Sequence, residues 1–166
     1  VVLFCYFASA LLYWGGGKFH NSMAAKAALG LAILGCILHL VILVMRTVLT
    51  GMLPLTNGLE FLLSFSWITV LLYLLMQTRY PIQPAAGAVM LISALLVSLV
   101  VILMRDQLSA VAPLMPALKS PWLTVHVITA AVAYAAFALA ARLAAVQFFP
   151  AGQSIKDDYI YLLVGG

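Results

Sequence analysis

The chain has 166 residues, of which 66% are hydrophobic and 7% are charged, and its mean hydropathy is +1.19. A soluble domain carries roughly a quarter charged residues, so this composition excludes a water-soluble globular protein. The net charge of +4 comes from eight Lys and Arg that stand singly between apolar stretches. No basic cluster would neutralise a row of phosphates, so we expect no nucleic-acid partner and a lipid bilayer as the solvent.

Five apolar segments follow one another along the chain, and a sixth begins near its end. They cover residues 1–14, 24–44, 59–76, 85–104 and 122–149, with 159–164 as the beginning of the next. Runs of this kind predict helices, because the strands of a membrane barrel would alternate in polarity. The predicted fold is therefore all-α, a polytopic transmembrane helix bundle of five spans and the start of a sixth.

Short segments rich in turn residues separate the spans. They are Gly15–Gly17, Pro54 with Asn57-Gly58, Pro81 with Pro84, Pro113 with Pro116, and 150–152. Helices joined by short connections run antiparallel, so we expect residues 1–166 to form a single transmembrane domain. The longer connection, 105–120, has a helical spacing of apolar residues broken by two prolines and is expected to lie along the membrane surface.

The two ends of the chain suggest a piece of a longer protein. The chain begins at Val1 rather than Met, and it stops soon after the sixth apolar segment has begun. A span needs about 20 apolar residues, so this last segment cannot cross a bilayer as it stands. We expect the chain to be a fragment.

The basic residues predict an orientation in the membrane. Five of them fall on one side of the predicted bundle and three on the other: Lys18, Lys26, Arg79, Arg142 and Lys156 against Arg46, Arg105 and Lys119. The positive-inside rule makes the first side cytoplasmic. The connection 54–60 and the start of the fifth span then lie together on the outer face. The fifth span is rich in alanine, which favours close packing and a central place in the bundle.

The start of the fifth span carries the first candidate site. Ser120-Pro121 is typical of a helix start, with Ser as the N-cap and Pro in the first turn. Trp122 and His126 then lie one turn apart on one face. A neutral imidazole there is suited to ligating a metal or heme iron, and an indole can pack on a porphyrin. The alternative is structural: an interfacial tryptophan and a histidine hydrogen-bonded to a neighbouring helix.

Two further ionisable residues are candidates. His39 lies deep in the second span, with Arg46 on the same face at i+7, and it is either a satisfied polar core residue or a relay or ligating residue. Glu60 follows Asn57 by three residues, which is the spacing of a capping box. Its carboxylate either completes that cap, or it binds a cationic partner or holds a loop.

Other chemistries have little support in the sequence. Cys5 and Cys36 lie far apart in apolar runs without a CxxC motif, so we interpret them as buried small hydrophobes. The chain has no Gly-rich phosphate loop, HExxH, nucleophile elbow or CxxCH. It is therefore not itself a c-type cytochrome.

Three segments together resemble a known family. The segment 119–126, KSPWLTVH, resembles the heme-binding segment of the CcsA (ResC) cytochrome c biogenesis proteins. The segment 54–60, PLTNGLE, ahead of a Trp-containing span, and the segment 154–166 resemble two further stretches of that family. The resemblance covers about three quarters of the chain, from His39 onward. Leu59 departs from it, because an aromatic residue is usual there.

The resemblance implies a system II protein that moves heme b to the outer face and attaches it through thioethers to the CxxCH cysteines of apocytochrome c. His126 would be an axial ligand of the heme iron, Trp122 would support it, and His39 would be an intramembrane residue on the heme path. The family's tryptophan-rich loop and second external histidine would lie beyond residue 166. Such a holocytochrome c synthase (heme lyase) works with a CcsB (ResB) type membrane partner and a thiol-reducing protein.

The expected location is the bacterial inner membrane or a thylakoid-type membrane, with the heme site on the outer face. Two alternatives remain open. One is a related heme-handling or regulatory membrane protein without attachment activity. The other is an electron-transfer subunit that holds a b-type heme between His39 and His126, which requires both imidazoles on facing helices at one depth.

Overall fold

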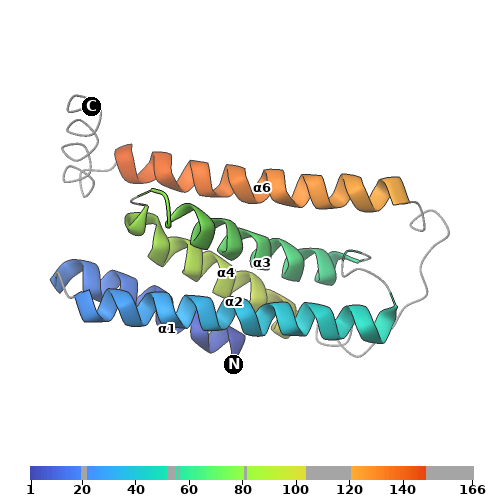
Figure 1. Ribbon diagram of the computed structural model, residues 1–166, viewed down its shortest axis with the longest axis horizontal. Coiled ribbons are helices and arrows are strands. Elements are labelled where there is room, and N and C mark those ends of the chain that lie inside the picture. The colour runs from blue at the N-terminus through green and yellow to red at the C-terminus, as the bar shows by residue number, and fades with distance from the viewer. Residues whose placement is uncertain (20–21, 52–54, 56, 81, 104–120, 149–166) are drawn as a thin grey trace.

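The computed structural model describes residues 1–19, 22–51, 55, 57–80, 82–103 and 121–148. This part of the chain forms five helices without strands: α1 (Val2–Phe19), α2 (Ser22–Thr50), α3 (Gly58–Met76), α4 (Gln83–Leu103) and α6 (Pro121–Phe148). The helices lie side by side and successive ones run in opposite directions (Figure 1). The predicted all-α bundle is confirmed.

Three of these helices contain stretches long and apolar enough to cross a membrane: Met23–Thr50, Gly58–Met76 and Ala85–Leu103. Shorter apolar stretches, Val2–Gly15 and Val125–Ala141, lie in α1 and α6. Large hydrophobic side chains are exposed on every one of the five helices, as expected where lipid covers the surface. The fold is that of a helical membrane protein.

One predicted helix boundary was wrong, and one helix extends beyond its apolar segment. Gly15–Gly17 does not separate two helices but lies inside α1, and α2 continues past residue 44 to Thr50. In lipid a helix supplies the hydrogen bonds that water cannot, so glycine is tolerated inside it. Near the end of α2 the Thr47 hydroxyl donates to a carbonyl one turn earlier, and Gly51, with φ of 68°, follows the last residue of the helix.

The helices differ in how many neighbours they have. α4 packs against α1, α3 and α6, whereas α6 packs against α3 and α4. α3 likewise packs against three helices, namely α2, α4 and α6, so within the described residues α6 lies at the edge of the bundle and the central position predicted for it belongs to α3 and α4. The small residues Ala131 and Ala135 are buried on one face of α6, so the alanines serve a close approach on that face alone.

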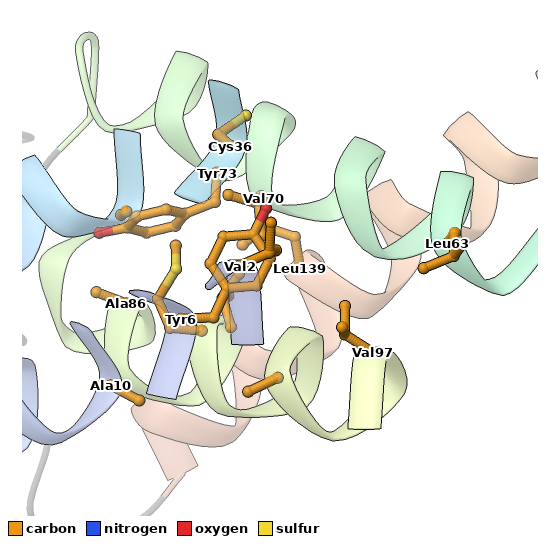
Figure 2. Close-up of a cluster of buried hydrophobic side chains, with 14 of the residues drawn as sticks. Val2, Tyr6, Ala10, Cys36, Leu63, Val70, Tyr73, Ala86, Val97 and Leu139 are labelled. Atoms are coloured by element: carbon orange, nitrogen blue, oxygen red, sulfur yellow. The ribbon is translucent and has the colours of Figure 1, made fainter. Parts of the chain in front are cut away.

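A continuous apolar core joins the helices. Figure 2 shows Tyr6 of α1, Cys36 of α2 and Tyr73 of α3 gathered in one cluster. Gly35 allows Tyr6 to approach α2, because a Cβ at this glycine would lie 2.8 Å from the tyrosine ring. The core thus holds α1 against α2. Because it is closely packed there, we expect a ligand site at the ends of the helices.

Some predictions lie outside the described residues. These are the surface segment 105–120, with Arg105 and Lys119, and the sixth apolar segment 159–164.

Candidate functional site

Because successive helices run in opposite directions, several helix ends lie at the same end of the bundle. α2 ends at Thr50, while α3 begins at Gly58 and α6 begins at Pro121, all at the same end of the bundle (Figure 1). We call this the pocket end. The sequence placed the connection 54–60 and the start of the fifth span on one side of the membrane, and the described helices agree with that arrangement.

An open pocket of about 390 Å³ lies at the pocket end, between the start of α3 and α6. Its lining is mostly apolar and includes one imidazole: Leu55, Asn57, Gly58, Phe61, His126, Val127 and Ala130. Phe61 supplies a flat apolar surface and His126 supplies a nitrogen that can ligate iron. Such a pocket can hold part of a flat apolar ligand while one edge of that ligand stays accessible.

His126 is exposed on the first turns of α6. The helix begins at Pro121, as predicted, while the expected N-cap Ser120 lies outside the described residues. Trp122, one turn before His126, is 82% exposed and does not belong to the pocket lining. Both side chains are thus available to a ligand or to another protein segment.

The start of α3 is held by two interactions. Asn57 is the N-cap, and its side-chain oxygen accepts a hydrogen bond of 2.8 Å from the backbone N–H of Glu60. The predicted cap is thereby confirmed on the Asn57 side. The Glu60 carboxylate accepts a hydrogen bond of 3.2 Å from the Arg46 guanidinium of α2. This contact within the chain differs from both roles predicted for Glu60, the cap and the binding of a cationic partner or loop.

His39 lies in the core, only 1% exposed. Its Nδ1 is 3.2 Å from the hydroxyl of Tyr6, and the two rings are 5.9 Å apart. Its Nε2 is buried and makes no hydrogen bond to the described residues. The interpretation as a satisfied polar residue thus holds for one ring nitrogen and not for the other.

The two histidines are not brought together. The His39 ring pairs with Tyr6 of α1, whereas α6, which carries His126, packs on α3 and α4. A heme shared by both residues needs facing helices. The described part of the chain therefore argues against the b-type electron-transfer alternative.

The remaining candidate ligands are dispersed. No group of three or more His, Cys, Asp and Glu that could hold a metal ion occurs among the described residues. Cys5 and Cys36 are free thiols, and both are buried, as interpreted from the sequence.

Sequence reasoning missed the pairing of Arg46 with Glu60. The signal for it was present, because both residues lie near the same predicted end of adjacent spans and carry opposite charges. It went unused because, for its contacts, Arg46 was considered only in relation to His39 on its own helix.

Comparison with known proteins identifies the family. Residues 55–156 match the family model described as Cytochrome C assembly protein, and this range contains the whole pocket lining. Curated relatives match over most of the chain. The cytochrome c biogenesis protein CcsA of Nostoc punctiforme is 30% identical over 90% of this chain and 43% of its own length. CcsA of Prochlorococcus marinus is 31% identical over 81% of this chain and 42% of its own length. CcsA of Cyanophora paradoxa is 24% identical over 88% of this chain and 46% of its own length.

The chain thus spans less than half the length of these relatives. No solved structure matched it. The family match covers more than half of the chain and includes the two helix starts that form the pocket. The chain belongs to the cytochrome c assembly protein family.

Proposed function

We propose that this chain is part of a membrane protein that presents heme at the outer membrane face and attaches it covalently to apocytochrome c during cytochrome c maturation. The observation that carries this proposal is the exposed His126 on the wall of an open pocket, within a cytochrome c assembly family. Heme b is the substrate in this proposal, moved and handed on rather than kept.

His126 would ligate the heme iron through a neutral imidazole nitrogen. Axial ligation fixes the orientation of the porphyrin and tunes the iron's potential. Phe61 lines the same pocket as His126, and Trp122 lies one helical turn before His126 on the exposed surface of α6. Both rings are suited to packing against the porphyrin face or edge. With the pocket open, the vinyl groups can face the incoming polypeptide.

The attachment step constrains the partners. Each cysteine thiol of a CxxCH motif adds across a vinyl group, so a C–S bond forms and the thiol hydrogen ends on the neighbouring carbon. No electrons are removed, but the thiols must be reduced beforehand. This chain contains no CxxC, so a separate thiol-reducing protein is part of the proposal, as is a CcsB (ResB) type membrane partner.

His39 has a less direct role in this proposal, as an intramembrane residue on the heme path. What supports it is the buried Nε2, which has no hydrogen-bond partner among the described residues and is therefore a nitrogen available for ligation. Its full burial means that heme reaches it only after the helices around Tyr6 move apart.

The orientation is also part of the proposal. Arg46 lies at the pocket end, while Lys18, Lys26 and Arg79 belong to segments at the other end of the bundle. This distribution of basic residues favours a cytoplasmic location for the end of the bundle opposite the pocket. The pocket would then face the outer side of a bacterial inner membrane or of a thylakoid-type membrane.

The test is replacement of His126 by Ala in the complete protein. We expect heme to be lost from the purified protein and cytochrome c maturation to stop, because the axial ligand is gone. Free imidazole in the growth medium should restore part of the maturation by occupying the vacated position. Val125→Ala is the matched control, since Val125 is exposed beside His126 and lies outside the pocket lining.

Two results separate the possibilities. Unchanged heme content and maturation in the His126→Ala protein would sink the proposal. Loss of heme with normal maturation would instead identify the related heme-handling or regulatory protein without attachment activity.

A further inference from the structure

An ion pair joins the pocket end of α2 to the first turn of α3. It consists of Arg46 and Glu60, and it lies beside the pocket without belonging to its lining. We propose that this ion pair is a positioning device that holds the first turn of α3 in place as the pocket wall facing His126. The inference rests on the proposed function, because it states how a heme-presenting pocket keeps its shape.

The burial of the pair is the first argument. The Glu60 side chain is 2% exposed and that of Arg46 is 13% exposed, and the guanidinium Nη2 lies 3.2 Å from the carboxylate Oε1. Charges inside an apolar bundle are costly and persist where they are paired. Because the two groups must stay in contact, the pair favours one register between α2 and α3.

The weakness of the surrounding interface is the second argument. α3 contacts α2 less extensively than it contacts α4 or α6. Besides the ion pair, α2 and α3 are joined by a hydrogen bond of 3.0 Å from the Trp67 indole N–H to the carbonyl of Cys36, which lies deeper in the bundle. Of these two contacts, the ion pair is the one at the level of the pocket wall.

The position of Glu60 in the chain connects the ion pair to the pocket. Its backbone N–H donates to the Asn57 side chain, and its carboxylate contacts Arg46. Its neighbours Asn57, Gly58 and Phe61 all line the pocket. Glu60 is therefore held from both sides, and a shift of this one residue would move the wall that faces His126.

Amide hydrogen exchange of the heme-free complete protein provides a test that does not depend on heme. In Glu60→Gln and Arg46→Gln variants we expect amides of residues 60 and 61 to exchange about tenfold faster, while those of α4 stay at the wild-type rate. The matched control is Trp67→Phe, which removes the hydrogen bond from Trp67 to the Cys36 carbonyl, deeper between the same two helices. It should leave exchange at residues 60 and 61 within about twofold of wild type.

Heme binding provides the second measurement. We expect either single variant to lower the affinity of the solubilised protein for heme about tenfold and to shift its Soret band, because the wall facing the iron ligand is displaced. The double variant Arg46→Gln/Glu60→Gln should lower the affinity no further than the worse single variant, since both changes break one interaction. Trp67→Phe should keep the wild-type spectrum.

These measurements distinguish the two ideas. If His126→Ala leaves heme binding intact, the proposed function fails, and the exchange rates still decide on the ion pair. If His126→Ala abolishes heme binding while Glu60→Gln and Arg46→Gln change neither exchange nor affinity, positioning by the ion pair is refuted. Should the single variants fail to accumulate, the double variant, which carries no unpaired buried charge, decides: wild-type exchange at residues 60 and 61 refutes the proposal, and faster exchange supports it.

Discussion

At the scale of single residues, the two histidines of the described spans occupy opposite environments. His126 is exposed at the pocket end, whereas His39 is buried and hydrogen-bonded through one nitrogen to Tyr6. An exposed imidazole can exchange ligands, and a buried one is held by its neighbours. This difference makes His126 the candidate for contact with an external partner and gives the Tyr6–His39 pair a role in the core.

The Tyr6–His39 hydrogen bond should contribute to stability. Replacing Tyr6 by Phe removes the hydroxyl and leaves Nδ1 of His39 buried without this partner. We expect the free energy of unfolding to fall by about 1 kcal/mol, the usual net value of one such bond. Equilibrium unfolding in mixed micelles would measure it. Tyr134→Phe, an equivalent change at an exposed site on α6, should have no effect, and equal losses in both variants would contradict the prediction.

At the scale of helices, close approach depends on where glycine stands. α1 packs extensively against α2, and the ring of Tyr6 lies over Gly35. α4 uses the same device, since a Cβ at Gly87 would lie 2.7 Å from the indole nitrogen of Trp14. Glycine in an apolar helix is thus a packing residue at Gly35 and Gly87 and no sign of a helix end.

Two glycines of α2 provide a matched comparison. At Gly35 a methyl group would meet Tyr6 at 2.8 Å and the Cβ of Cys5 at 3.1 Å, whereas at Gly30 it would meet nothing within 4 Å. Gly35→Ala should therefore destabilise the bundle by about 1–3 kcal/mol through overpacking. Gly30→Ala should be neutral or stabilising by up to about 1 kcal/mol, since alanine is the better helix former. Unfolding in mixed micelles would compare the two, and an equal response would refute the packing argument.

At the scale of the whole molecule, the sequence determined much of the fold because lipid leaves few choices. The length of the apolar segments predicted every described helix. The residue types at the helix starts predicted the Asn57 cap and the start of α6 at Pro121. The contact of His39 with Tyr6 and the edge position of α6 were not predictable, and for the pairing of Arg46 with Glu60 the sequence offered only opposite charges at one end of adjacent spans. Each depends on which helices become neighbours, and hydropathy carries no information about neighbours.

The proposed orientation of the bundle rests on charge alone and can be tested directly. Leu103 ends α4 at the pocket end and is exposed, while Tyr80 follows α3 at the opposite end and is also exposed. Single cysteines at these two positions should react from opposite sides of the membrane, since the described native cysteines are buried. The positive-inside rule predicts that a membrane-impermeant maleimide labels Leu103→Cys in intact spheroplasts and Tyr80→Cys only in inverted vesicles. The reverse pattern would place His126 on the cytoplasmic face, where it could not present heme to a cytochrome matured outside.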